Sequence, residues 1–240
     1  MKLVPAGIIP RDPGLRLKLQ RAPAAATVSE TPKPVPVAAC TATGATAMFA
    51  SFNFTGNLPD YVSDSGAVFT LSSGNTAADT YLVENGVLRR QDFSEGPDSG
   101  GESWAYTDQQ PATTRFYIEA TITFKGLPNG PDPEFSALYF YQNATAPGNP
   151  DVLCGLSSQG LGVDASLLGF QNIAYTTLPN TPYVMRLFVD GHDLTLCING
   201  SVVATAALGA DLTLPVGIDT FNFGGANNFA IDDLRIVDVP

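Results

Sequence analysis

The chain has 240 residues, of which 44% are hydrophobic and only 15% are charged, with 23 glycines and 19 prolines. This composition supplies a sizeable apolar core and many turns, and it argues against a helical protein. The charge is unevenly divided: residues 1–39 carry six basic and two acidic side chains, whereas the rest carries six basic and 21 acidic ones. The acidic part would repel phosphates, so nucleic acid is not expected as its partner.

Residues 1–45 are predicted to form an extended arm and linker, because seven prolines between Pro5 and Pro36 exclude a long helix. Leu15, Leu17 and Leu19 alternate with Arg16 and Lys18, as in a half-buried strand. We expect this basic segment to dock on an acidic partner by strand addition or groove binding. A solvated tail is the alternative.

The prolines also interrupt the apolar residues at the start of the chain, so no secretory signal is predicted. No segment approaches the roughly 18 apolar residues of a membrane span, so no membrane insertion is expected. Synthesis in a reducing cytoplasm is the resulting expectation. Three cysteines do not make a disulfide framework. Cys154 and Cys197 are predicted to pack as small core residues, and one disulfide stays possible.

Residues 46–240 are predicted to form one all-β domain, a two-sheet antiparallel jelly-roll sandwich. Residues 115–124 alternate strictly, with Phe116, Ile118, Ile122 and Phe124 on one face. Asn199-Gly200 is a strong hairpin signal. No segment has a helical period of useful length. Further strands are expected at residues 136–142, 183–189, 194–198, 201–206 and 229–237.

Several of these segments resemble laminin-G-like and concanavalin-A-like jelly-roll domains. The resemblance rests on Tyr183 to Gly191 followed by Leu194 to Ser201, two strands with an Asp-Gly and an Asn-Gly-Ser turn, and on the closing Phe229 to Ile236. Phe52 to Gly56 is similar to the first strand of such domains. The resemblance covers Met48 to Pro240. Domains of this kind are frequent in bacteriophage virion proteins, on tails and as head decorations.

Enzymes with this fold carry motifs that are missing from this sequence. The Glu-x-Asp-x-x-Glu strand of laminarinase-like glycosidases is absent, and hydrolysis by that route needs two carboxylates flanking one bond. Glu119 is the one carboxylate that the pattern places in the middle of a clear strand. His192, the single histidine, falls in a predicted turn. The sequence therefore predicts a protein without catalytic activity.

A glycan-binding face is predicted from the side of the strands opposite the core. Tyr117 and Glu119 lie on this side of one strand, Tyr139 and Tyr141 on that of a second, and Arg186 with Phe188 on that of a third. Aromatic rings beside polar groups suit sugar rings. Contact with a neighbouring subunit or a covering loop is the alternative. Trp104, after a glycine-rich loop, is predicted as a further platform or as the edge of the core.

Asp232 and Asp233 form an acidic pair in the predicted last strand. In the domains that the chain resembles, an acidic residue here often helps to hold a structural calcium ion, and carboxylates are suitable ligands for it. Hydrogen bonding of the pair to nearby backbone amides is the alternative. No other cofactor is expected.

Together these observations predict a bacteriophage virion accessory protein, a capsid decoration or tail component. Its arm would bind other virion proteins, and its jelly roll, a homo-oligomer in the assembly, would face outward toward host surface glycans. The alternative is a carbohydrate-binding module or a polysaccharide-degrading enzyme of the same fold.

Overall fold

A computed structural model describes the chain from residue 37 to residue 240, except for residues 72–80, 91–100, 125–135, 143–151, 158–159, 166–170, 174, 179, 208–215 and 223–228. The predicted arm segment Leu15 to Leu19 therefore lies outside the described residues. All described residues belong to one unit, which ends at Pro240. Within the described part, no helix is long and apolar enough to cross a membrane.

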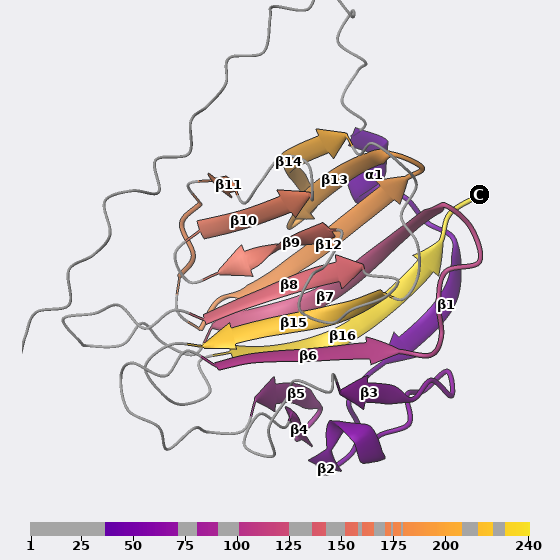
Figure 1. Ribbon diagram of the computed structural model, residues 1–240, viewed down its shortest axis with the longest axis vertical. Helices are drawn as coiled ribbons and strands as arrows, with labels where there is room; N and C mark the ends of the chain where they lie inside the picture. Colours follow the sequence, from indigo (N-terminus) through magenta and orange to yellow (C-terminus); the bar gives the residue numbers. More distant parts are fainter. Residues whose placement is uncertain are drawn as a thin grey trace, which may run out of the picture. The chain divides into compact units, whose positions relative to one another are not determined.

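Two antiparallel sheets form this unit, which confirms the predicted all-β sandwich (Figure 1). One sheet has nine strands in the order β14-β13-β12-β7-β16-β5-β4-β2, with β1 also paired to β16, and the other has seven in the order β11-β10-β9-β8-β15-β6-β3. The strands of the first are β1 Ala45–Ala50, β2 Gly56–Asn57, β4 Tyr81–Glu84, β5 Val87–Arg90, β7 Arg115–Phe124, β12 Pro182–Asp190, β13 Asp193–Ile198, β14 Ser201–Ala207 and β16 Phe229–Asp238. Those of the second are β3 Phe69–Leu71, β6 Gly101–Thr107, β8 Ser136–Gln142, β9 Val152–Ser157, β10 Gly160–Ala165, β11 Gln171–Ile173 and β15 Val216–Asn222.

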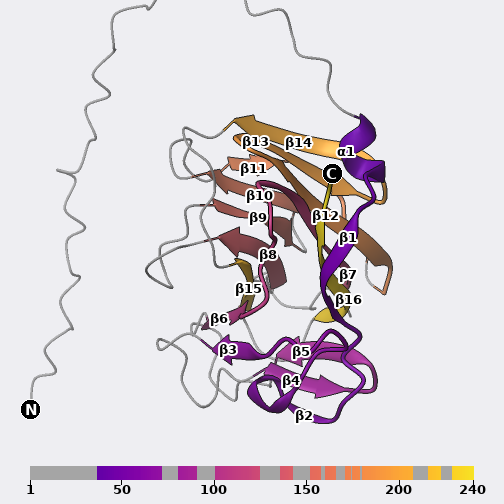
Figure 2. The same cartoon turned by 90° about the vertical axis from the view of Figure 1, so that its right-hand side faces the viewer.

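The main core lies between the two sheets, which Figure 2 shows face to face. Phe116, Ile118, Ile122 and Phe124 of β7 are all at most 2% exposed, as the alternation predicted. They pack in one cluster with residues of the opposite sheet such as Ala105. Burial of these side chains supplies the main driving force for folding.

Asparagine and glycine close two hairpins of the nine-stranded sheet. Asn199 and Gly200 have φ values of 50° and 74° between β13 and β14, so the predicted turn is confirmed. Asn85 and Gly86 repeat this geometry between β4 and β5, with φ of 54° and 80°. Left-handed backbone suits these two residue types, and the resulting turn matches the twist of the flanking strands.

The start of the domain differs from the prediction. The first strand is β1, before the Phe52 to Gly56 segment that was expected to form it. Phe52 instead turns the chain with φ of 53°, and its side chain is fully buried. The backbone N–H of Phe52 donates to the hydroxyl of Tyr61 at 3.0 Å, so the turn keeps its buried donor paired.

Two short helices complete the described elements: α1 (Val37–Thr41) and the 3₁₀ turn η1 (Leu58–Asp60). α1 falls in the region predicted to be linker, yet it contacts β12, β13 and β14 of the nine-stranded sheet. In Figure 2 it lies on the outer side of that sheet, away from the seven-stranded sheet.

Candidate functional site

The residues predicted to form one glycan-binding face belong to two different sheets. Tyr117, Glu119 and Arg186 lie on β7 and β12 of the nine-stranded sheet, whereas Tyr139 and Tyr141 lie on β8 of the seven-stranded sheet. The prediction of a single face is therefore wrong. The chain passes from one sheet to the other between β7 and β8, and strand alternation carries no information about such a crossing.

On the outer face of the nine-stranded sheet, Glu119 is bound by two arginines. Its carboxylate accepts from Arg186 Nε at 2.6 Å and from Arg235 Nε at 2.8 Å. The Glu119 side chain is 5% exposed, against 12% for Arg186 and 43% for Arg235. Burial alone would lower the pKa of Arg235, but the hydrogen bond and charge of Glu119 raise it. Glu119 and Arg186 thus form a buried ion pair, and Arg235 is a third, partly exposed member of the cluster.

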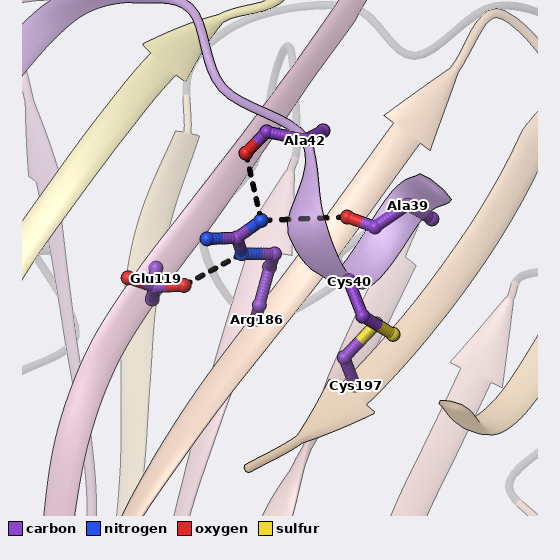
Figure 3. The surroundings of a disulfide bond; sticks show 6 residues. All are labelled: Ala39, Cys40, Ala42, Glu119, Arg186 and Cys197. Atoms are coloured by element: carbon purple, nitrogen blue, oxygen red, sulfur yellow. Dashed lines mark hydrogen bonds and ion pairs between the residues drawn. A yellow bond between two sulfur atoms is a disulfide. The ribbon is translucent and has the colours of Figure 1, made fainter. Parts of the chain in front are cut away.

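Helix α1 and Ala42 lie next to Arg186 of this cluster, as Figure 3 shows. Cys40 of α1 forms a disulfide with Cys197 of β13. Nη1 of Arg186 donates to the carbonyl of Ala42 at 3.0 Å and to that of Ala39 at 3.4 Å. Cys197 is buried, as predicted, and it forms the one disulfide that the sequence left open. Because 157 residues separate the two cysteines, no local sequence pattern predicts their pairing.

The cover continues into a small apolar cluster. Ala39 packs with Tyr117, Phe188, Val237 and Val239, and each of the five is at most 6% exposed. The alternative considered for the predicted glycan face, packing under another part of the chain, is what occurs for Tyr117. Tyr117 and Glu119 are closed to a ligand, so their predicted glycan contacts are corrected.

The outer face of the seven-stranded sheet holds the other predicted residues. Trp104 lies inside β6 rather than in a loop, and it pairs with Asp219 of β15, which in turn pairs with Tyr139 of β8. Two residues along the strands, Tyr106 pairs with Gly217 and Gly217 with Tyr141. Neighbours two apart in a strand share a face.

The side of the sheet on which these residues lie follows from β6. Ala105 is fully buried in the core, whereas Tyr106 is only partly buried. Because successive residues alternate in direction, Trp104 and Tyr106 belong to the face that looks away from the core. Their paired partners Asp219, Tyr139 and Tyr141 share that face.

Two acidic residues also have register positions on this face, although Glu119 was expected to be the one carboxylate in the middle of a clear strand. Asp219 is the fourth residue of β15 and sits between Trp104 and Tyr139. Glu102 of β6 pairs with Phe221, two residues beyond Asp219 on β15. Short strands such as 216–222 carry too weak a pattern for their register to be predicted, so sequence reasoning missed both.

Asp232 and Asp233 lie at a bulge in β16, where the register with β7 shifts before Arg235. Asp233 has φ of 52°, and its backbone N–H donates to Asp232 Oδ1 at 2.8 Å. Burial, and then the charge of Asp233, raises the pKa of Asp232. No group of three acidic, histidine or cysteine side chains that could hold a metal occurs among the described residues. The local hydrogen bond explains the pair, and calcium stays a prediction.

Comparison with known proteins gives a fold and no family. No protein-family model matches the chain, and no curated protein does. Among solved structures, one from the study of endo-acting O-glycanases of the human gut microbiota that initiate mucin breakdown has 12% identity and a TM-score of 0.56, covering 82% of this chain and all of that one. A glycoside hydrolase family protein from Mycobacterium thermorestibile has 14% identity, a TM-score of 0.52, and coverage of 79% and 99%.

The calcium-bound exoplasmic/lumenal domain of VIP36 is also similar, with 10% identity, a TM-score of 0.50, and coverage of 77% of this chain and 89% of that one. Identities this low establish the architecture alone, since one fold hosts many functions. The chain therefore has the concanavalin-A-like jelly-roll fold that lectins and glycoside hydrolases share, as its sequence resemblance implied.

Proposed function

We propose that this chain is a carbohydrate-binding domain whose ligand lies on the outer face of the seven-stranded sheet. The observation that carries the proposal is the register, which brings Trp104, Tyr139, Tyr106 and Tyr141 together around Asp219. Aromatic rings offer large apolar area to the C–H faces of sugars, and a carboxylate between them accepts hydrogen bonds from hydroxyl groups. Similarity in fold to lectin-like and glycoside hydrolase structures supports the same assignment.

The contrast between the two outer faces favours this choice. On the nine-stranded sheet, Ala39 of α1 packs with the buried ring of Tyr117, and the carbonyls of Ala39 and Ala42 are bound by Arg186. On the seven-stranded sheet, Tyr106 of β6 is partly exposed and its neighbour Thr70 of β3, paired with it, is exposed. A face that is at least partly exposed where it is described, at Tyr106 and Thr70, suits a ligand better than one that the chain itself covers.

The experiment is a glycan array followed by titration calorimetry of the best ligand with the full chain. Trp104→Ala and Tyr139→Ala are each expected to weaken binding about tenfold, which corresponds to roughly 1.4 kcal/mol. Phe54→Ala is the matched control, since this partly exposed aromatic lies outside the seven-stranded sheet. A blank array, or equal losses in all three variants, would contradict the proposed site.

Glycoside hydrolysis is a second candidate because Glu102 and Asp219 are diagonal neighbours on adjacent strands of this face. The backbone positions of such neighbours are about 7–8 Å apart in sheets, so their carboxyl groups can reach a separation of similar size. Inverting glycosidases use carboxyl groups separated by about 6.5–9.5 Å. We expect binding without turnover, as predicted from the missing glycosidase motif. Release of reducing ends from a bound glycan, lost in both Glu102→Gln and Asp219→Asn while binding persists, would establish hydrolysis instead.

The more specific role as a virion component stays a prediction. It depends on the arm, which lies outside the described residues, and on the presence of the chain in purified particles. The fold comparisons support carbohydrate recognition and add nothing to the virion role. Quantitative mass spectrometry of particles, with the chain present in a fixed copy number, is the measurement that would support it.

A further inference from the structure

Residues 37–43, which include helix α1, form a short segment over the nine-stranded sheet that we call the strap. One disulfide, Cys40–Cys197, joins the strap to the sheet. Helix α1 is a single five-residue turn, Val-Ala-Ala-Cys-Thr, which is far too short to be stable by itself in water. Of its side chains, Ala39 and Cys40 are buried, and both are small. Little apolar area therefore holds α1 in place, and the Cys40–Cys197 disulfide is its strongest link to the sheet.

The noncovalent contacts of the strap depend on a side chain that has other partners. Arg186 donates to the carbonyls of Ala39 and Ala42, but its Nε also binds Glu119. Its guanidinium carbon lies 3.9 Å from the centroid of the Tyr117 ring. If the strap lifts, Arg186 keeps both Glu119 and Tyr117 and exchanges only two carbonyls for water. Detachment therefore leaves the ion pair intact.

The strap ends at a fixed pivot. A Cβ atom at Gly44 would lie 1.7 Å from the carbonyl oxygen of Asp238, so Gly44 is pressed against the backbone of β16. From Ala45 onward the chain is paired with β16 as β1. Lifting of residues 37–43 about this point would uncover Tyr117, Phe188 and Val239 and leave β1 in the sheet.

We propose that the Cys40–Cys197 disulfide is a redox latch for this strap. A dithiol reductant breaks the S–S bond and delivers two electrons and two protons. Two cysteine thiols form, and the dithiol becomes a cyclic disulfide. In the oxidised chain α1 is closed over the sheet. In the reduced chain α1 lifts about Gly44 and exposes an aromatic and apolar surface bordered by Arg186, Arg235 and Arg115, whose guanidinium lies 5.7 Å from the Phe188 ring centroid.

The test compares the oxidised and dithiol-reduced full chain by hydrogen exchange of residues 37–44, by binding of a hydrophobic dye, and by far-ultraviolet circular dichroism. Reduction is expected to speed exchange of this segment at least tenfold and to raise dye fluorescence while the β spectrum stays unchanged. Cys40→Ala should behave as the reduced chain with or without dithiol. Cys154→Ala, at the cysteine outside the pair, should respond to dithiol as the natural chain does.

Three results would overturn the latch. Three free thiols in the untreated protein would show that the bond does not form. Equal exchange of residues 37–44 in the oxidised chain, the reduced chain and Cys40→Ala would show that the strap is held without it. Loss of the β spectrum on reduction would show that the disulfide holds the whole sandwich rather than the strap.

Discussion

The guanidinium of Arg186 stacks over the ring of Tyr117, 3.9 Å from its centroid, while its Nε donates to Glu119 at 2.6 Å. This arrangement satisfies a buried cation on two sides, by the face of an aromatic ring and by a carboxylate. The third side is closed by two carbonyls of the strap. Tyr117, Glu119 and Arg186, which were predicted to bind a glycan, thus help to hold helix α1 on the nine-stranded sheet.

Replacing Glu119 with glutamine is expected to destabilise the domain by about 3 kcal/mol, because removal of one member of a buried ion pair leaves its partners uncompensated. For about 200 folded residues this lowers the melting temperature by roughly 6–12 °C. Differential scanning calorimetry measures it. Glu84→Gln is the control, because its ion pair with Arg89 is partly exposed and should contribute less than about 1 kcal/mol. Equal shifts in both variants would contradict a structural role for Glu119.

Replacing Gly44 with alanine should destabilise the domain because the new Cβ would meet the Asp238 carbonyl oxygen at 1.7 Å. Overpacking against backbone costs about 1–3 kcal/mol, so a melting temperature roughly 5 °C lower is expected. Gly66→Ala is the comparison, since a Cβ there meets nothing within 4 Å although φ is +90°. The Gly66→Ala variant measures the cost of left-handed backbone alone. A larger drop in melting temperature for Gly66→Ala than for Gly44→Ala would contradict the close contact between Gly44 and the Asp238 carbonyl.

Asp64 is expected to make stability depend on acid pH. Hydrogen bonds from Ser51, the backbone N–H at 2.7 Å first among them, lower the pKa of Asp64 below its usual value. A depressed folded-state pKa stabilises the protein above the unfolded pKa, and this contribution is lost as the pH falls through the folded pKa. Asp64→Asn should therefore melt below the natural chain at pH 7, and the difference should shrink as the pH falls toward 2.

The matched control for that series is Asp60→Asn, at an exposed carboxylate at the end of η1. Its melting temperature should follow the natural chain across the same pH range. A difference between Asp64→Asn and the natural chain that stayed constant from pH 7 to pH 2 would mean that the carboxylate charge is not responsible.

The carboxylate of Asp232 is expected to affect the pH dependence of stability in the opposite direction from Asp64. Burial, followed by the charge of Asp233, raises the pKa of Asp232, so the folded state disfavours the ionised form. The penalty is absent below the unfolded pKa and becomes complete as the pH rises through the folded pKa. Asp232→Asn keeps an acceptor for the Asp233 N–H and is expected to melt about 1–3 °C higher at pH 7, with no gain near pH 3. If Asp232 held a calcium ion, Asp232→Asn would instead melt below the natural chain at pH 7 in calcium-containing buffer.

The arm prediction is separate from the fold. Residues 1–45 carry seven prolines, and residues 1–21, with Pro5, Pro10 and Pro13 among them, are not expected to form a core of their own. Their deletion is expected to leave the melting transition of the jelly roll unchanged and to prevent incorporation into particles. Equal incorporation of the two chains would refute anchoring, and loss of folding would mean that the arm belongs to the domain.

The sequence by itself determined the local features of this protein. Alternation in 115–124 identified the buried face of β7, and Asn199-Gly200 identified a hairpin, because both depend on residues within a few positions of each other. Such patterns establish which side of a strand is apolar. They do not state which strand lies next to it.

Only the tertiary structure decided how these strands meet. It placed Tyr117 and Tyr139 on different sheets, joined Cys40 to Cys197 across 157 residues, and laid α1 over Tyr117. It also brought Trp104 beside Asp219 and Tyr139, although 115 residues separate the first two in the chain. The physical reason is that sheet partners are chosen by burial summed over the whole domain, whereas alternation reports only whether one strand has an apolar side.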